Sequence, residues 1–156
     1  MRKALLILAV TIAVAGCGGG GPSVQTTAPV IRDITITTGT VNGLGTVLVN
    51  GTGRTLYVYA PDGAKGVTCN GGCQQDWPPL QITASQHLEA QGGVQQKLLG
   101  SDPNPLGGLT VTYKGWPLYT FTGDSNPGNA NGQDRDLQGG YWYAITPSGA
   151  LIKKPA

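Results

Sequence analysis

Two carboxylates end two copies of one short phrase, and their type and spacing raise the question of acid–base chemistry. The phrase is Leu-Tyr-x-aromatic-x-x-Asp, at 56–62 and again at 118–124. A pair of carboxyl groups can act as general acid and base when a fold holds them at a fixed separation. Nothing in the spacing along the chain brings Asp62 and Asp124 together. The sequence therefore names no catalytic residue.

The aromatic side chains of the same phrase could instead form a ligand site. Flat aromatic surfaces with a few polar anchors suit sugars, glycans and other ring-bearing ligands. Tyr141, Trp142 and Tyr143 would extend such a surface. The candidate residues of this groove are Tyr57, Tyr59, Asp62, Trp77, Trp116, Tyr119, Phe121 and Asp124.

A structural interpretation of these residues needs no ligand. Residues two apart in a strand share a face, so Tyr57 and Tyr59 point the same way, as do Tyr119 and Phe121. Such aromatics commonly form a core or the wall beside it. The Asp that ends each phrase would accept backbone N–H groups of the turn that follows. Both interpretations stay open at this point.

The N-terminus carries a targeting signal. Arg2 and Lys3 precede an apolar run over 4–15, which ends in Val-Ala-Gly-Cys at Cys17. This pattern indicates a secretory signal peptide, too short to span a membrane. Its ending resembles the bacterial lipobox, in which the chain is cut just before the Cys and the thiol is acylated. The resemblance implies that Cys17 anchors the protein to a membrane through at least two acyl chains, palmitate among them.

The net charge of the chain belongs to this signal. The sequence has 10 Lys+Arg and 8 Asp+Glu, for a formal net charge of +2. Arg2 and Lys3 leave with the signal, so the mature chain carries equal numbers of each sign. A neutral domain without a basic patch excludes nucleic acid as a partner.

Cys69 and Cys73 remain once Cys17 is lipidated. An even pair outside the reducing cytoplasm favours a disulfide. The two glycines of "CNGGC" let the backbone turn enough to join the sulfurs. Redox dithiols usually read Cys-x-x-Cys, and a zinc site wants four ligands where the chain offers a single histidine, His87. The pair is predicted to be a structural disulfide.

An oxygen-rich loop at 123–136 raises calcium as a further possibility. Counted from Asp124, position 12 is Arg135, where a calcium loop has a bidentate Glu, so an ordered turn-rich loop is favoured. His87 lies in a polar run and is predicted to be a solvated surface residue. Haem is not indicated, since there is no Cys-x-x-Cys-His and the lone Met leaves with the signal. We therefore expect no metal and no cofactor.

Short β-branched and aromatic runs separated by turns predict the fold class. No long helical periodicity appears, and the chain has 26 Gly and 11 Pro. These features predict an all-β domain with long Gly/Pro-rich loops. Three hairpins are expected, at 46–60, 108–122 and 141–153. A weakly alternating run at 30–41 would add a strand at the domain edge, and 95–100 would form one helical turn.

The first two hairpins read as copies of one unit. Val49 aligns with Val111 and Tyr57 with Tyr119, at one constant offset. Each half is too small to bury a core alone, so the two should pack together as a sheet, a sandwich or a partly open barrel. The expected organisation is a signal peptide at 1–16, a lipidated Cys and flexible tether at 17–41, and a β-rich domain at 42–156. Its related halves are about 44–80 and 107–152.

Several segments together carry a family resemblance. They are "GLGTVLVNGTGRTLYVYAPD" (43–62), "TCNGGCQQDWPPL" (68–80), "VTYKGWPLYTFTGD" (111–124), "PGNANGQ" (127–133) and "YWYAITPSG" (141–149). The chain resembles the bacterial lipoproteins with a Tyr-x-[Phe/Trp/Tyr]-x-x-Asp motif, also described as a secreted repeat of unknown function. Such proteins often carry His where this chain has Trp116, so a role of that His would be lost here. The resemblance implies an envelope location and a duplicated β unit, and it supplies no activity.

The functional expectation follows from these features. We expect a lipid-anchored protein on the extracytoplasmic face of the cell membrane or outer envelope, acting as a binding or scaffold module. Its partners would be the membrane, through the N-terminal lipid, and a glycan, a small ligand or an envelope protein. The alternatives are an envelope enzyme that uses Asp62 and Asp124, and a redox or metal accessory lipoprotein.

Overall fold

The computed structural model describes residues 32–63 and 66–153. It divides the chain into two units, Met1–Val30 and Ile31–Ala156, and the description that follows concerns the second. The expected signal peptide, the lipid attachment at Cys17 and the first part of the tether lie outside the described residues.

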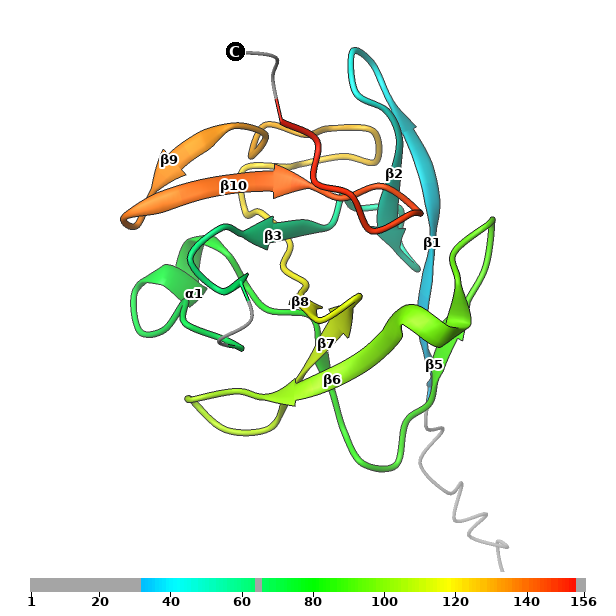
Figure 1. Cartoon of the computed structure of the whole chain (residues 1–156), viewed down its shortest axis with the longest axis vertical. Coiled ribbons are helices and arrows are strands. Elements are labelled where there is room, and N and C mark those ends of the chain that lie inside the picture. Colours follow the sequence, from blue (N-terminus) through cyan, green and yellow to red (C-terminus); the bar gives the residue numbers. More distant parts are fainter. Residues whose placement is uncertain (1–31, 64–65, 154–156) are drawn as a thin grey trace, which may run out of the picture. The chain divides into compact units, whose positions relative to one another are not determined.

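The described domain is built almost entirely from short strands, which confirms the all-β prediction (Figure 1). Three sheets have the orders β2-β1-β5, β3-β10-β9 and β4-β7-β6, with β8 paired to β7. Helical structure in the described part is confined to single turns. The elements are β1 (Ile34–Val41), β2 (Gly45–Asn50), β3 (Tyr57–Tyr59), α1 (Cys73–Asp76), β4 (Gln81–Ile82), β5 (Leu88–Ala90), η2 (Gln96–Leu98), β6 (Leu99–Pro103), β7 (Leu109–Tyr113), β8 (Trp116–Pro117), β9 (Arg135–Leu137) and β10 (Gly140–Ala144).

Strand β1 lies in the middle of its sheet, whereas the sequence suggested an edge strand or the end of the tether. It pairs antiparallel with β2 along the run from Ile36 to Val41 and parallel with β5 at its start. The main-chain N–H of Ile34 donates to His87 at 2.8 Å, and the carbonyl of Ile36 accepts from Gln91 at 2.9 Å. The run is rich in Thr, so its hydrophobic alternation is too weak to reveal pairing on both sides.

The second hairpin forms as predicted, with β7 and β8 joined by a two-residue turn. Thr112 pairs with Pro117 and Tyr113 with Trp116. The turn residues Lys114 and Gly115 have φ of 53° and 79°. Two positive φ angles give the backbone twist that matches two flanking strands, as in a type I′ turn. The expected helical turn at 95–100 is also present, as the 3-10 helix η2.

The first hairpin is one residue longer and does not form a regular ladder. Its arms meet at an isolated bridge between Val49 and Thr55, and Leu56 donates to the Leu48 carbonyl. In the second hairpin, Leu118 donates to the Val111 carbonyl instead. The structural equivalent of Val111 is therefore Leu48, and the alignment of Val111 with Val49 was wrong by one residue. The constant offset hid this because it ignored the different turn lengths.

The two halves meet around an approximate two-fold axis. Tyr57 and Tyr119 lie opposite each other, and each main-chain N–H donates to the carbonyl of the other, at 2.8 and 2.9 Å. A second pair of bonds repeats this symmetry at 2.9 and 3.0 Å, from Ala60 to the Tyr141 carbonyl and from Thr122 to the Asp76 carbonyl. The duplication is thus visible in the hydrogen bonds.

Two buried clusters fill the domain, one on each face of the central strands. The tyrosines of β3 face one cluster, and Leu56 and Val58 face the other, as the strand alternation predicts. The first cluster contains Val41, Val47, Val49, Tyr57, Tyr59, Val67, Cys69, Cys73, Trp77, Tyr119, Trp142 and Ala144. The second contains Ile36, Leu48, Leu56, Val58, Ile82, Val94, Val111, Tyr113, Leu118 and Ile145.

Candidate functional site

The tyrosine and the aspartate of each repeated phrase bond to the other copy. The Tyr57 hydroxyl donates to Asp124 Oδ2 at 2.7 Å, and the Tyr119 hydroxyl donates to Asp62 Oδ2 at 2.7 Å. All four residues are at most 1% exposed. We call these four residues the crossed Tyr–Asp pairs. A tyrosine of one repeat is thus satisfied by the carboxylate of the other.

The second oxygen of each carboxylate holds the loop that follows it. Asp62 Oδ1 accepts the main-chain N–H and the hydroxyl of Thr68, at 2.8 and 2.6 Å. Asp124 Oδ1 accepts the main-chain N–H of Asn131 at 2.7 Å. These are the turn contacts that the structural interpretation expected, made further along the chain. Buried carboxylates satisfied in this way are bound to the protein itself.

Burial and the nearby carboxylates keep both phenols protonated. Burial, followed by the hydrogen bond to Asp124, raises the pKa of Tyr57 well above its ordinary value. Burial, followed by the charge of Asp62, raises the pKa of Tyr119 in the same way. Loss of either hydroxyl proton would place two negative charges side by side in the core.

Four aromatic rings form a continuous stack beside the crossed pairs. Trp77 and Trp142 lie nearly parallel, at 2°, with ring centroids 3.9 Å apart. Phe121 stacks on the outer side of Trp77 at 4.2 Å, and Tyr59 on the outer side of Trp142 at 4.5 Å. We call these four residues the ring stack. Because Tyr59 and Phe121 are equivalent positions of the two repeats, the stack also follows the two-fold axis.

The two tyrosines of the crossed pairs meet this stack edge-on. Tyr57 approaches Trp77 at 5.5 Å and 82°, and Tyr119 approaches Trp142 at 5.2 Å and 90°. Edge-to-face and offset stacked contacts are both favourable because of the ring quadrupole. Gly132 leaves room for the arrangement, since a Cβ there would lie 2.7 Å from the Trp77 ring.

The indole N–H groups of the stack have weak partners or none. Trp142 Nε1 donates to the Leu137 carbonyl at 3.2 Å. Trp77 Nε1 is buried and has no hydrogen-bond acceptor among the residues the structure describes. A buried donor without an acceptor costs about 1–3 kcal/mol, so the position of Trp77 is set by ring contacts.

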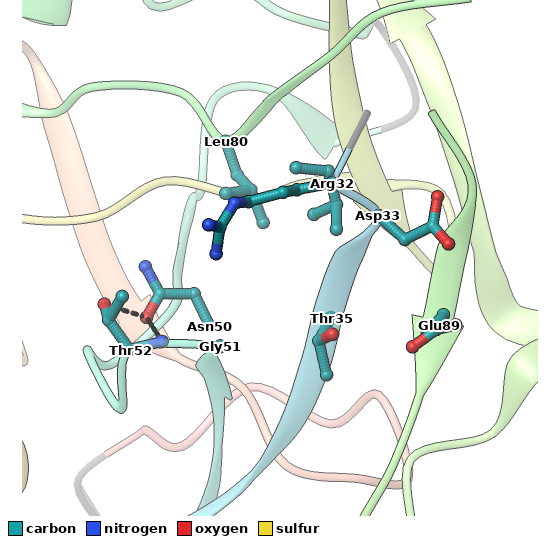
Figure 2. A pocket seen from close by; sticks show the side chains of 9 residues that line it. Arg32, Asp33, Thr35, Asn50, Gly51, Thr52, Leu80 and Glu89 are labelled. Atoms are coloured by element: carbon teal, nitrogen blue, oxygen red, sulfur yellow. Dashed lines mark hydrogen bonds between the residues drawn. The ribbon is translucent and has the colours of Figure 1, made fainter. Parts of the chain in front are cut away.

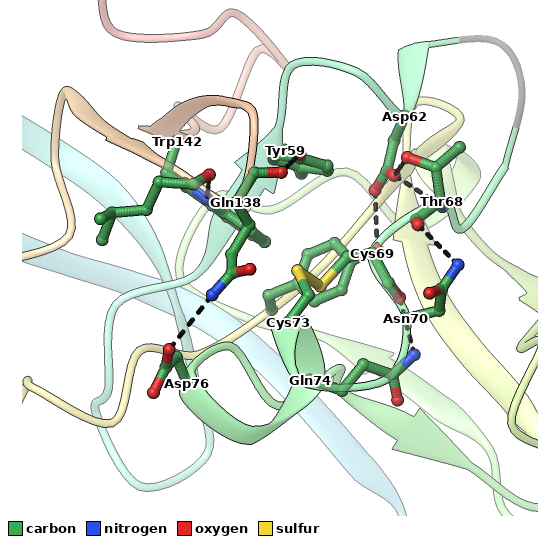
Figure 3. The surroundings of a disulfide bond; sticks show 12 residues. Tyr59, Asp62, Thr68, Cys69, Asn70, Cys73, Gln74, Asp76, Gln138 and Trp142 are labelled. Atoms are coloured by element: carbon green, nitrogen blue, oxygen red, sulfur yellow. Dashed lines mark hydrogen bonds between the residues drawn. A yellow bond between two sulfur atoms is a disulfide. The ribbon is translucent and has the colours of Figure 1, made fainter.

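The predicted disulfide between Cys69 and Cys73 is present and closes a short loop before α1 (Figure 3). Both cysteines are buried in the cluster that holds the ring stack. Gln74 fixes the loop by donating to the Cys69 carbonyl at 2.8 Å. Figure 3 shows Asp62 with its bond to Thr68 on one side of the disulfide, and Gln138 reaching Asp76 on the other. The bridge thus supports the wall of the core.

The structure gathers seven of the eight predicted groove residues in one place, but in the interior. The crossed pairs, Trp77, Tyr59 and Phe121 are mutual neighbours, and of these only Phe121 is more than 5% exposed. Trp116 is separate, packed half-buried against the other cluster. Thr68, Asn131 and Gly132 belong to the same network and were missed. Their signal in the sequence was faint, a polar or small residue six to eight positions after each Asp.

An aromatic pair lies on one face of β10, with Tyr141 exposed and Tyr143 partly buried against the second cluster. Tyr141 is 48% exposed, and its ring stacks on that of Tyr143 with centroids 6.0 Å apart and 17° between planes. Asp136 of β9 is opposite Tyr141 in the ladder and shares its face. Lys153 Nζ lies 5.4 Å from the centre of the Tyr143 ring. We call Asp136, Tyr141, Tyr143 and Lys153 the tyrosine face.

Burial and nearby negative charges act on the Tyr143 hydroxyl of the tyrosine face. Partial burial, followed by the negative charge of Asp134 and the neighbouring Tyr141 and Asp136, raises the pKa of Tyr143. The phenol of Tyr143 is therefore a neutral donor at neutral pH. Such a surface offers rings, donors and acceptors together.

Other hollows on the domain are open to solvent. One of about 580 Å³ lies near the start of β1, where Arg32 extends across it and Thr52 bonds to Asn50 (Figure 2). A second hollow of about 530 Å³ lies between the β1–β2 face and Pro127. Neither contains a residue of the repeated phrase.

The other chemistry suggested by the sequence is not assembled in the described part of the chain. His87 is a surface residue, with its side chain 84% exposed and Nδ1 3.3 Å from Asp33 Oδ1. Within residues 32–63 and 66–153, no group of three His, Cys, Asp or Glu side chains could hold a metal ion. No helix in this part is long and apolar enough to cross a membrane.

Comparison with known families assigns the two repeats. The model of a family described as a secreted repeat of unknown function matches residues 39–81 and again 103–146, together more than half of the chain. No curated protein and no solved structure matches the chain significantly. The word "secreted" in the description indicates an extracellular location. The chain thus belongs to this family of secreted repeats of unknown function, and it carries two copies of the repeat.

Proposed function

We propose that the protein is a lipid-anchored, extracytoplasmic glycan-binding module whose binding surface is the tyrosine face. In this proposal Cys17 carries the lipid, and the tether lifts the domain from the membrane. The Tyr-x-aromatic-x-x-Asp motif that the sequence suggested for the family serves to join the two halves of the domain. It contributes no ligand contacts.

One observation carries the choice of surface. Tyr141 is exposed on a sheet face, and it is stacked on a second tyrosine that is itself incompletely buried. The aromatic side chains of the motif, in contrast, already pack against other protein groups in the ring stack and the crossed pairs. The exposed ring of Tyr141 on β10 therefore offers the aromatic surface that a ligand could contact.

The chemistry around these rings favours a glycan. The apolar C–H faces of a sugar pack on aromatic rings, and its hydroxyls need both donors and acceptors nearby. The tyrosine hydroxyls and Asp136 supply both. The expected neutral charge of the mature chain gives no steering toward a strongly charged polymer.

The enzyme alternative finds no support in the geometry of Asp62 and Asp124. An acid–base pair must reach its substrate within hydrogen-bond distance. Asp62 is 0% and Asp124 1% exposed, and both oxygens of each carboxylate accept from protein donors. A substrate could reach neither group without opening the core.

Mass spectrometry of the protein from its host membrane tests the anchor. We expect an N-terminus at Cys17 that carries acyl chains, and release of a Cys17→Ser variant from the membrane fraction. A mature N-terminus elsewhere, or an unmodified Cys17, would contradict the anchor and leave the tyrosine face untouched.

Co-sedimentation with insoluble polysaccharides, peptidoglycan, chitin and cellulose, tests the binding surface. The protein would be the secreted Cys17→Ser chain. Tyr141→Ala should weaken binding about fivefold, because a stacked ring contributes on the order of 1 kcal/mol. Leu106→Ala is the matched control, since Leu106 is 61% exposed and lies outside the tyrosine face. Equal binding by both variants, or no binding to any polysaccharide by the parent chain, would refute the proposal.

A further inference from the structure

The buried core contains the side chains that are easiest to oxidise, in contact with one another. Tryptophan and tyrosine lose one electron more readily than any other side chain lacking sulfur. Here Trp77 and Trp142 form the centre of the ring stack, and each has one tyrosine of the crossed pairs at its edge. An electron can pass between rings at these separations without an intervening group.

The two tryptophans are suited to share a positive charge. Their planes are 2° apart with centroids at 3.9 Å, so the π systems face each other directly. Spreading one positive charge over two rings lowers the energy needed to remove the electron. The outer neighbours, Phe121 and Tyr59, add two more π faces to the stack.

Neither tryptophan can stabilise its oxidised form by losing a proton to a base. Trp77 Nε1 has no acceptor among the described residues, and Trp142 Nε1 donates to the Leu137 amide carbonyl, which is a very weak base. A tryptophan radical cation formed in this stack therefore keeps its proton and stays a strong oxidant. The positive charge remains free to move to a better site.

The two tyrosines of the crossed pairs, unlike the tryptophans, each have a carboxylate that can accept a proton. Each hydroxyl donates at 2.7 Å to a carboxylate, Tyr57 to Asp124 and Tyr119 to Asp62. When a tyrosine loses an electron its hydroxyl becomes strongly acidic, and the proton can cross this short hydrogen bond. The product is a neutral tyrosyl radical beside a neutral carboxylic acid, so the core holds less charge than before.

We propose that the ring stack and the crossed pairs form a trap for one-electron oxidants, a function independent of glycan binding. An oxidising radical, such as a peroxyl or carbonate radical, accepts one electron from the Trp77–Trp142 pair and becomes an anion. The tryptophan radical cation then takes one electron from Tyr57 or Tyr119. The hydroxyl proton of that tyrosine moves to Asp124 or Asp62, and the radical stays on the buried phenoxyl oxygen.

Pulse radiolysis with azidyl radical, a one-electron oxidant that selects tryptophan, tests this sequence of steps. The secreted Cys17→Ser chain would also carry Trp116→Phe, because Trp116 is half-exposed and lies outside the stack. Every oxidised tryptophan then belongs to the ring stack. We expect the tryptophan radical absorption to decay as the tyrosyl absorption grows, at a rate independent of protein concentration.

Paired tyrosine variants identify where the radical ends. In Tyr57→Phe/Tyr119→Phe the tryptophan radical should persist at least about tenfold longer, since about 1.4 kcal/mol in the transfer step is enough for that factor. Tyr113→Phe removes a buried tyrosine of the other cluster whose hydroxyl donates to the Pro147 carbonyl, not to a carboxylate, and should leave the transfer unchanged. Loss of the transfer in Tyr113→Phe, or unchanged transfer in the double variant, would overturn the proposal.

A measurement on the parent chain protects the test against variants that fold poorly. High-field electron paramagnetic resonance of the freeze-trapped radical separates hydrogen-bonded from free tyrosyl radicals. The proposal requires the hydrogen-bonded signal, since the proton stays on the adjacent carboxylic acid. A free tyrosyl signal, or a tryptophan radical as the final species, would refute it.

Discussion

In the first repeat the stacked tryptophan, Trp77, is flanked by Asp76 and Pro78, whereas in the second repeat Trp142 is flanked by Tyr141 and Tyr143. The flanking pairs occupy equivalent places, since Asp76 and Tyr141 accept the same main-chain bond. The tryptophans between them are buried and alike. The comparison teaches that the two repeats agree where they pack together and differ where they meet solvent.

The residues that the repeats share and the residues in which they differ have separate roles. The shared residues hold the halves together, and all of them except the partly buried Phe121 lie in the interior. The first repeat adds a disulfide loop that packs beside the ring stack, and the second adds the β9–β10 hairpin with the tyrosine face. A search for function guided by the repeated phrase alone would lead to the core.

Removing either stacked tryptophan should have the largest effect. Trp77→Ala and Trp142→Ala should each lower the free energy of unfolding by about 3–5 kcal/mol, because each leaves a large cavity in the ring stack. Denaturant unfolding followed by circular dichroism measures both. The half-buried Trp116→Ala is the control and should cost clearly less. A marked inequality between Trp77 and Trp142 would break the equivalence of the two repeats.

A double-mutant cycle tests the crossed connection directly. Tyr57→Phe and Asp124→Asn should be coupled by about 1–3 kcal/mol, since both remove the same buried hydrogen bond. Tyr57→Phe and Asp62→Asn, which belong to different pairs, should be additive within about 0.5 kcal/mol. If Tyr57 coupled to the Asp of its own repeat instead, the crossed arrangement would be wrong.

Much of this arrangement was accessible from the sequence, and the reason for the rest is geometric. Alternation along β3 placed Tyr57 and Tyr59 on one face, and the turn at Lys114 and Gly115 revealed the second hairpin. The spacing of Cys69 and Cys73 revealed the disulfide. Each of these is a local property of a few consecutive residues.

The crossed bonds and the ring stack could not be predicted in the same way. They join Tyr57 to Asp124 and Trp77 to Trp142, residues far apart in the sequence that are brought together by the two-fold axis. The sequence showed that the phrase was repeated, but not that each copy completes the other. The central position of β1 in its sheet could not be predicted for a similar reason, since its parallel partner β5 lies far along the chain.

Opening the disulfide should affect only the first repeat. Cys69→Ser/Cys73→Ser should lower the free energy of unfolding by about 2 kcal/mol, the low end for disulfides, because the closed loop is short. Hydrogen exchange should become faster around α1 while the amides of β10 keep their protection. Equal loss of protection in both regions would show that the repeats do not respond separately.

Alkaline pH should act on both crossed pairs alike. The pKa of Tyr57 and of Tyr119 is raised in the folded protein, so stability is complete below the unfolded tyrosine pKa of about 10 and falls as the pH rises above it. Each tyrosine should contribute a loss of about 1.4 kcal/mol per pH unit there. Melting temperatures from pH 8 to about 11 in the parent and in Tyr57→Phe/Tyr119→Phe measure this. Equal slopes in the two proteins would contradict it.

The crossed pairs also set a condition on when the chain can begin to fold. Tyr57 has its hydrogen-bond acceptor, Asp124, in the second half, and Trp77 has its stacking partner, Trp142, there as well. The first half therefore has no complete core of its own. Asp124 and Trp142 both belong to the second repeat, so neither the crossed pairs nor the ring stack can form from the first repeat alone. The domain can therefore close its core only when both repeats are available.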